Sequence, residues 1–182
     1  MFFQNKAYET EQDITIASYS SMRNIVGISL GTRLLGIAVV YDGTLSDFRV
    51  RTFYGKWNEK KRTTIIATIQ KAIDQYGIAS IVVKTPKSKH CSVSIQGLLH
   101  DIRLISEQRG INLQVCTVSC LRERYTARGR PNKRALIQGI INKYPQHGQL
   151  VSRYSKERSN RSAYHVKLFE AIACAEMQSK TE

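Results

Sequence analysis

The residues whose types could do chemistry gather in two basic segments. The first follows a short apolar run at residues 79–83 and leads to Ser92, which is placed to cap a helix. Its basic side chains are Lys84, Lys87, Lys89 and His90. Lysines beside a helix amino terminus attract phosphate, because the unpaired N–H groups and the helix dipole favour an anion there. The segment therefore predicts a phosphate-binding site. His90 could act as a general base, although a lone loop histidine is more often a hydrogen-bonded bystander.

The second basic segment runs from residue 122 to residue 167 and is rich in arginine. The side chains that we assign to nucleic-acid binding there are Arg122, Arg124, Arg128, Arg130, Lys133, Arg134, Arg158 and Arg161. Arginine offers planar, bidentate donors that fit a phosphate group. Tyr125, Tyr154 and Tyr164 are interleaved with these cations and would suit stacking on unpaired bases, while packing at the domain surface explains them equally well.

Positive charge extends over the whole chain. Its 182 residues include 28 Lys and Arg against 14 Asp and Glu, which gives a formal net charge of +14. Such an excess favours a polyanionic partner, because cations that neutralise phosphates release condensed counterions. Nucleic acid is the first candidate, ahead of anionic membranes, acidic proteins and a role in solubility alone.

The sequence gives no sign of a membrane segment or of a framework built on cysteine. No stretch approaches the ~18 consecutive apolar residues of a transmembrane helix, and the amino terminus lacks the apolar core of a secretory signal. We therefore expect a cytoplasmic protein with no membrane partner. The four cysteines, Cys91, Cys116, Cys120 and Cys174, are dispersed without a CxxC pair, which predicts neither a zinc site nor disulfides.

Hydrophobic patterning predicts an α/β arrangement to hold these residues. Residues 1–22 are polar and aperiodic, so we expect a flexible tail before a single domain at 23–182. Three β-rich segments then follow, and Asp42-Gly43 predicts a two-residue hairpin turn between the second and the third. The later elements predicted are helices at 57–76, 92–109, 133–143 and 163–178 and strands at 79–83 and 112–118. The arginine-rich connector after residue 119 and the polar stretch up to residue 161 carry no other predicted element.

The first hairpin carries a glycine pattern with a known parallel. Residues 25–40, IVGISLGTRLLGIAVV, place Gly27, Gly31 and Gly36 at the spacing hGhDxGxxxxGhAh, in which h is apolar. This pattern resembles the opening strands of the ribonuclease H-like superfamily, in particular RuvC-type Holliday-junction resolvases and the YqgF family. We expect positive φ at Gly31 and close backbone approach at Gly36. The resemblance implies an α/β, ribonuclease H-like fold with a mixed five-stranded sheet, three antiparallel strands then two parallel, flanked by helices.

Two later segments extend this resemblance. ARGRPNKRALIQGIINKYP is similar to the GxGxAxKxxV segment that opens a late helix in the RuvC group, through Gly129, Arg130 and Lys133. YHVKLFEAIACAE is similar to the final helix of that group, where Glu170 takes the place of a metal-binding aspartate. The matches together span roughly the folded part of the chain.

The resemblance implies a metal site, but most of its carboxylates are missing here. Nucleases of this fold hydrolyse phosphodiesters with divalent ions held by clustered acids. The positions of three such acids are Ser29, Lys84 and Glu170, so only the last is acidic. Lys84 would repel a dication at close range. We expect no bound metal and an ion pair between Lys84 and Glu170 instead. Other acids, namely Asp42, Asp47, Asp101 and Glu107, are expected in a turn or at the surface.

These observations favour a nucleic-acid-binding, catalytically inactive relative of RuvC/YqgF-type nucleases, with no assignable catalytic residue. One alternative is an endonuclease dependent on Mg or Mn that acts on branched DNA or precursor RNA and keeps metal through Glu170 and unrecognised ligands. Another is a protein-interaction scaffold, because a fold does not fix a function. The choice between DNA and RNA and the formation of a homodimer are left open.

Overall fold

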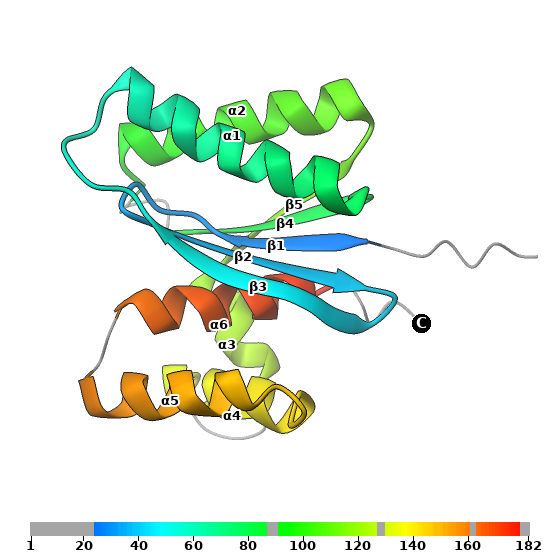
Figure 1. Cartoon of the computed structure of the whole chain (residues 1–182), viewed down its shortest axis with the longest axis vertical. Coiled ribbons are helices and arrows are strands. Elements are labelled where there is room, and N and C mark those ends of the chain that lie inside the picture. Colours follow the sequence, from blue (N-terminus) through cyan, green and yellow to red (C-terminus); the bar gives the residue numbers. More distant parts are fainter. Residues whose placement is uncertain (1–23, 87–90, 127–129, 161–162, 179–182) are drawn as a thin grey trace, which may run out of the picture.

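Five runs rich in apolar and β-branched residues form one mixed sheet in the computed structural model, which describes residues 24–86, 91–126, 130–160 and 163–178 (Figure 1). The strands are β1 (Ile25–Ser29), β2 (Leu34–Tyr41), β3 (Thr44–Thr52), β4 (Ser80–Thr85) and β5 (Asn112–Thr117). Their order across the sheet is β3-β2-β1-β4-β5. The pairs β1–β2 and β2–β3 are antiparallel, whereas β1–β4 and β4–β5 are parallel. The predicted sheet is thereby confirmed.

The β2–β3 turn has the conformation that its sequence predicts. Asp42 and Gly43 have φ values of 46° and 72°, and Tyr41 pairs with Thr44 across them. Positive φ at both central residues defines the turn type whose twist matches that of the flanking strands, and the Asp-Gly pair tolerates it well.

Two capped helices cover one face of the sheet, α1 (Glu59–Tyr76) and α2 (Val93–Arg109) (Figure 1). The Asn58 side chain accepts a hydrogen bond from the Lys61 N–H at the start of α1, and Ser92 accepts one from Ile95 at the start of α2. Both helices end at a glycine in the left-handed conformation, as predicted. Their buried isoleucines and leucines pack against apolar side chains of β1, β2 and β4 to form one half of the core.

The other face is covered by α6 (Ala163–Ala175), with α3 (Val118–Arg124), α4 (Lys133–Lys143) and α5 (Gly148–Asn160) packed around it (Figure 1). The sequence had predicted α4 with these bounds and a longer α6, but it missed α3 and α5. Few of the described side chains of these two helices are buried. Within α3 only Leu121 is buried, and Leu150 is the fully buried anchor of α5 within the described part of that helix.

Glycines allow α6 to touch the sheet directly. A Cβ at Gly27 would lie 2.1 Å from the Ala171 carbonyl oxygen, and one at Gly36 would lie 2.1 Å from that of Lys167. The predicted close approach at Gly36 is therefore confirmed. The prediction of positive φ at Gly31 is wrong, because φ at that residue lies outside the left-handed range. Space explains this glycine instead, since a Cβ would meet the Leu34 carbonyl oxygen at 2.6 Å.

Several predictions fall on residues that the structure does not describe. These are the tail at residues 1–22, the side chains Lys87, Lys89, His90, Arg128 and Arg161, and Gly129. Among the helices within the described ranges, none is both long enough and apolar enough to cross a bilayer.

Candidate functional site

Three side chains that the sequence singled out meet beneath α6. Ser29 ends β1 and is paired in register with Lys84 of β4, so both side chains point to the face that α6 covers. Glu170 points back from α6. Its Oε2 accepts one hydrogen bond from Ser29 Oγ at 2.6 Å and one from Lys84 Nζ at 2.9 Å. The predicted ion pair between Lys84 and Glu170 is confirmed by this distance. We call the three residues the interior cluster.

The interior cluster is almost removed from water. Ser29, Lys84 and Glu170 have exposed fractions of 0%, 8% and 5%. Charges that lose their hydration in this way are tolerated only when a partner of opposite sign and further hydrogen bonds compensate for it. The carboxylate therefore depends on Lys84, and the ammonium depends on Glu170.

A second lysine, which the sequence did not identify as part of this site, adjoins the interior cluster. Lys167 lies one helical turn before Glu170 on α6, and its Nζ donates to the Leu30 carbonyl oxygen at 2.7 Å. The pKa of Lys167 is lowered to about 8, mainly by burial and secondly by the charge of Lys84, while Glu170 opposes the shift. Its spacing of three from Glu170 on an otherwise apolar helix face was the signal available in the sequence.

Two thiols occupy the next place along the sheet. Cys116 pairs in register with Lys84, and its Sγ lies 3.8 Å from that of Cys174 on α6. The contact with Cys174 lowers the pKa of Cys116, whereas burial raises that of Cys174 well above its ordinary value. These are soft ligands beside the cluster, where a hard cation such as Mg²⁺ would need oxygen.

The residues present do not fit the divalent ions that nucleases of the ribonuclease H-like fold use. Glu170 is the one carboxylate of the interior cluster, and the oxygen it presents already accepts two hydrogen bonds. Lys84 adds a positive charge where a dication would have to bind. Across the described ranges, no three His, Cys, Asp or Glu side chains are arranged to hold a metal ion.

The other acids considered from the sequence lie away from the interior cluster, as expected, and of these Glu107 is exposed on α2. Asp101 binds Arg62 through two hydrogen bonds of 2.6 and 2.8 Å, which tie α2 to α1 on the opposite face of the sheet. Asp47 of β3 lies 3.3 Å from Arg49 of the same strand, and Asp42 forms the hairpin turn. None of these carboxylates contributes to the interior cluster.

The predicted nucleic-acid-binding residues divide into structural and exposed groups. Arg124 donates to the carbonyl oxygens of Glu176 at 2.8 Å and Met177 at 3.0 Å, so it caps the chain just after α6. Arg130 and Arg134 are exposed at the start of α4. Arg122 and Lys133 are half-buried, and Arg158 lies on α5 with its side chain outside the described part.

Two of the interleaved tyrosines pack rather than project outward. The ring of Tyr125 lies against Gly139, where an added Cβ would be 2.5 Å from the ring, and burial raises its pKa to about 12. The Tyr164 hydroxyl donates to the Val50 carbonyl oxygen at 3.0 Å. Packing therefore explains both residues. The side chain of Tyr154 lies outside the described part.

Comparison with known proteins identifies the fold. No protein-family model and no curated protein sequence matches the chain. Among solved structures, RuvC of T. thermophilus in complex with Holliday junction substrate aligns with a TM-score of 0.62 at 13% identity, over 84% of this chain and 90% of RuvC. Fowlpox virus resolvase, solved with substrate Holliday junction DNA, aligns with a TM-score of 0.53 at 10% identity, over 86% of this chain and 96% of the resolvase. At sequence identities this low, the likeness shows a shared fold alone. This chain has the ribonuclease H-like fold of the RuvC and poxvirus resolvases.

Proposed function

We propose that this chain is a cytoplasmic nucleic-acid-binding protein that does not hydrolyse its ligand. The observation that carries the proposal is the 2.9 Å ion pair between Lys84 and Glu170. An ammonium held at this distance neutralises the one carboxylate on which a catalytic metal would depend.

The chemistry of phosphodiester hydrolysis explains why this pair matters. Two divalent ions would have to activate water and stabilise the leaving oxygen, and acidic ligands must hold both ions. Here the interior cluster supplies one acid and one cation, with Lys167 as a second cation beside it. A dication would have to displace Lys84 and then remain close to its charge, which costs several kcal/mol in a partly buried site.

Nucleic acid is the ligand that the charge and the fold favour together. The net charge of +14 suits a polyanion, and both of the resolvases described above were solved with Holliday junctions. The exposed Arg130 and Arg134 would contact phosphates at the start of α4. The proposed ligand is therefore DNA or RNA in a structured or branched form, bound without a cofactor, and by one copy or a homodimer.

The decisive experiment is a salt-titrated binding panel. Single-stranded, duplex and four-way-junction substrates would be measured with and without Mg²⁺ or Mn²⁺. We expect binding that weakens steeply with salt, is insensitive to divalent ions and leaves every substrate intact. Metal-dependent cleavage that disappears in a folded Glu170→Gln variant would instead establish the endonuclease. A lack of salt-dependent affinity for every substrate would favour the protein-interaction scaffold.

A matched pair of variants tests the binding surface. Arg130→Glu with Arg134→Glu should lower affinity for all substrates and reduce the slope of log K against log salt by about 2 for duplex. The control is Lys71→Glu with Arg103→Glu, which makes the same change of charge at exposed positions of α1 and α2, across the sheet from α4 (Figure 1). Equal losses in the two double variants would mean that net charge, and not this surface, governs binding.

A further inference from the structure

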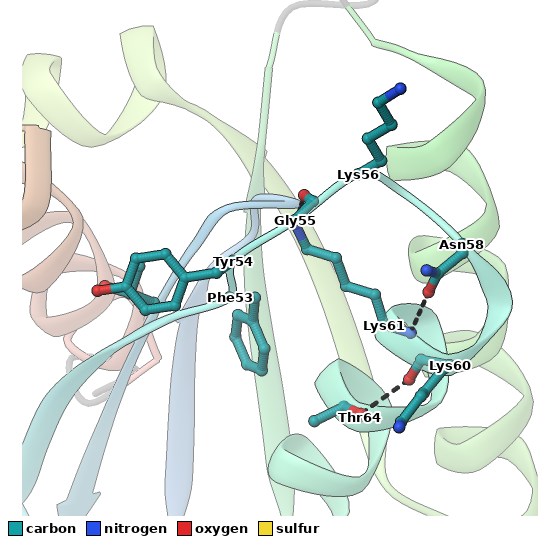
Figure 2. A pocket seen from close by; sticks show the side chains of 9 residues that line it. Phe53, Tyr54, Gly55, Lys56, Asn58, Lys60, Lys61 and Thr64 are labelled. Carbon is teal, nitrogen blue, oxygen red and sulfur yellow. Dashed lines mark hydrogen bonds between the residues drawn. The ribbon is translucent and has the colours of Figure 1, made fainter.

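A hollow lined by lysines and aromatic rings lies where β3 leads into α1 (Figure 2). It has a volume of about 360 Å³ and is formed mainly by residues 52–61. A second hollow of about 330 Å³ adds Thr32, Arg33 and Trp57 and shares Tyr54 and Lys61 with the first, so the two adjoin. We call them together the β3–α1 hollow.

The backbone of this hollow is held in place by hydrogen bonds. Phe53 donates its N–H to the Arg33 carbonyl oxygen at 2.8 Å, which ties the loop to the β1–β2 turn. Gly55 has φ of 81°, and its carbonyl oxygen accepts from Lys61 Nζ at 2.9 Å. Lys61 thus helps to hold the shape of the loop that lines the hollow.

Two aromatic rings remain open to solvent in this ordered loop. Tyr54 is 81% exposed, and Trp57 is 37% exposed. Figure 2 shows the Tyr54 ring projecting from the chain beside Gly55. A single exposed aromatic residue needs no explanation. Two of them in one loop, next to several lysines, offer flat faces for planar ligands.

Two lysines of the hollow are available to a ligand. Lys56 and Lys60 are exposed, and within the described ranges neither ammonium pairs with a carboxylate. The nearby Glu59 lies 3.5 Å from Arg62, which offsets its charge. The loop therefore carries unneutralised positive charge close in sequence to its exposed aromatic residues.

The hollow also lies at the end of the sheet where the interior cluster is found, namely the end at which β1 and β3 finish. Ser29 pairs with Gly36, and Leu34 pairs with Thr52, so the β1–β2 turn and the end of β3 lie at that end. A strand of nucleic acid that crosses this end of the sheet would meet the β3–α1 hollow.

We propose that the β3–α1 hollow binds an unpaired segment of nucleic acid, with Tyr54 and Trp57 stacking on bases and Lys56 and Lys60 contacting phosphates. This inference rests on the proposed function. It adds which part of the nucleic acid the hollow binds, namely bases outside a duplex. Stacking needs accessible base faces, which a continuous duplex hides.

The chain contains a reporter for this test. Trp57 is its one tryptophan, so intrinsic emission reports on the hollow. Titration with a short oligothymidine should quench that emission to saturation, and a blunt duplex of equal length should quench it much less. Binding of the oligothymidine, measured by the anisotropy of a labelled strand, without any change in Trp57 emission would overturn the inference while leaving the proposed function intact. Quenching by anionic phospholipid vesicles but not by oligothymidine would also overturn it.

Variants separate stacking from general attraction. Tyr54→Ala should weaken oligothymidine binding by about 10-fold or more. Lys56→Ala with Lys60→Ala should reduce the salt slope for single strands by about 1.4. The matched control is Tyr41→Ala, which removes an exposed tyrosine at the β2–β3 turn. This turn lies at the opposite end of these strands from the hollow. Parental affinity in Tyr54→Ala, or an equal loss in Tyr41→Ala, would contradict stacking in the hollow.

Discussion

The interior cluster and the β3–α1 hollow use the same kind of side chain in opposite ways. Lys84 is buried and donates to Glu170, so its charge is compensated within the protein. Lys56 and Lys60 are exposed and have no such partner in the described part of the chain. A buried charge must be paired to be tolerated, whereas a hydrated one is stable alone and can exchange its water for a phosphate.

The net charge of the chain therefore overstates the number of cations that are free to bind a polyanion. Arg124 caps the end of α6, Arg62 joins α1 to α2, and Lys167 contacts a backbone carbonyl beside the interior cluster. Each of these cations contributes to the charge of +14 while holding the fold together. The exposed lysines of the hollow and the arginines at the start of α4 are the cations that we expect to bind.

The largest loss of stability is expected when the one acid of the interior cluster is removed. Glu170→Gln keeps the shape of the side chain but leaves Lys84 buried without an opposite charge. We expect the free energy of unfolding to fall by about 3 to 5 kcal/mol, measured by urea denaturation. The double variant Lys84→Met with Glu170→Leu removes both charges and should recover most of the loss. A decrease below about 1 kcal/mol for Glu170→Gln would show that the pair does not support the fold.

The next largest effect concerns the contact that brings Glu170 to the sheet. In Gly36→Ala the new Cβ would lie 2.1 Å from the Lys167 carbonyl oxygen, so α6 would have to move away from β2. We expect a loss of about 1 to 3 kcal/mol in unfolding free energy. The control is Gly97→Ala in α2, where the nearest atom is 4.0 Å away. This second change should stabilise the protein slightly, because alanine favours a helix. Equal effects in the two variants would contradict the close packing of α6.

A smaller effect depends on pH and on Lys167. Its pKa is about 8 in the folded protein and 10.5 ordinarily, so the folded state loses this proton first. Between these values the unfolded chain holds more protons, and stability should therefore rise with pH from about 8 to about 10.5. We expect a gain of about 1 to 2 kcal/mol, allowing for the partial exposure of the side chain. Lys167→Met should lack this gain in stability. Subtracting the variant's profile of unfolding free energy against pH from that of the parent removes the contribution of the other groups that titrate in this pH range. Parallel profiles would contradict the burial of this ammonium.

The sequence predicted the elements whose signals are local. Asp42-Gly43 determined the hairpin turn, and Gly77 and Gly110 marked the ends of α1 and α2, because each of these residues favours its conformation regardless of distant contacts. The helices α3 and α5 were missed because few of their described side chains are buried, chiefly Leu121 and Leu150. The predicted end of β4 at residue 83 was too early, because Lys84 is polar yet lies within the strand. For Gly31 the rule applied was one of backbone conformation, whereas the real constraint is space.

The sequence identified the three residues of the interior cluster but not all of the residues around them. Ser29, Lys84 and Glu170 were found through the spacing of a family pattern, and their contact then followed from the sheet order. Lys167 is not part of that pattern, and its spacing from Glu170 was the one signal for it, while the β3–α1 hollow had no such signal. The position of Lys167 depends on how α6 rotates onto the sheet, and the hollow depends on a loop whose shape is set by Gly55 and Lys61.

The exposed lysines of the β3–α1 hollow should contribute least to stability. Lys56→Ala with Lys60→Ala removes two exposed cations that have no partner in the described part of the chain. The unfolding free energy should stay within about 0.5 kcal/mol of the parent, because solvated surface charges contribute little to folding. The same variant should lose affinity for unpaired nucleic acid, so stability and binding would respond independently. A loss of stability above about 1 kcal/mol would mean that these lysines support the loop, as Lys61 does. The β3–α1 hollow would then be a structural feature, as the interior cluster is.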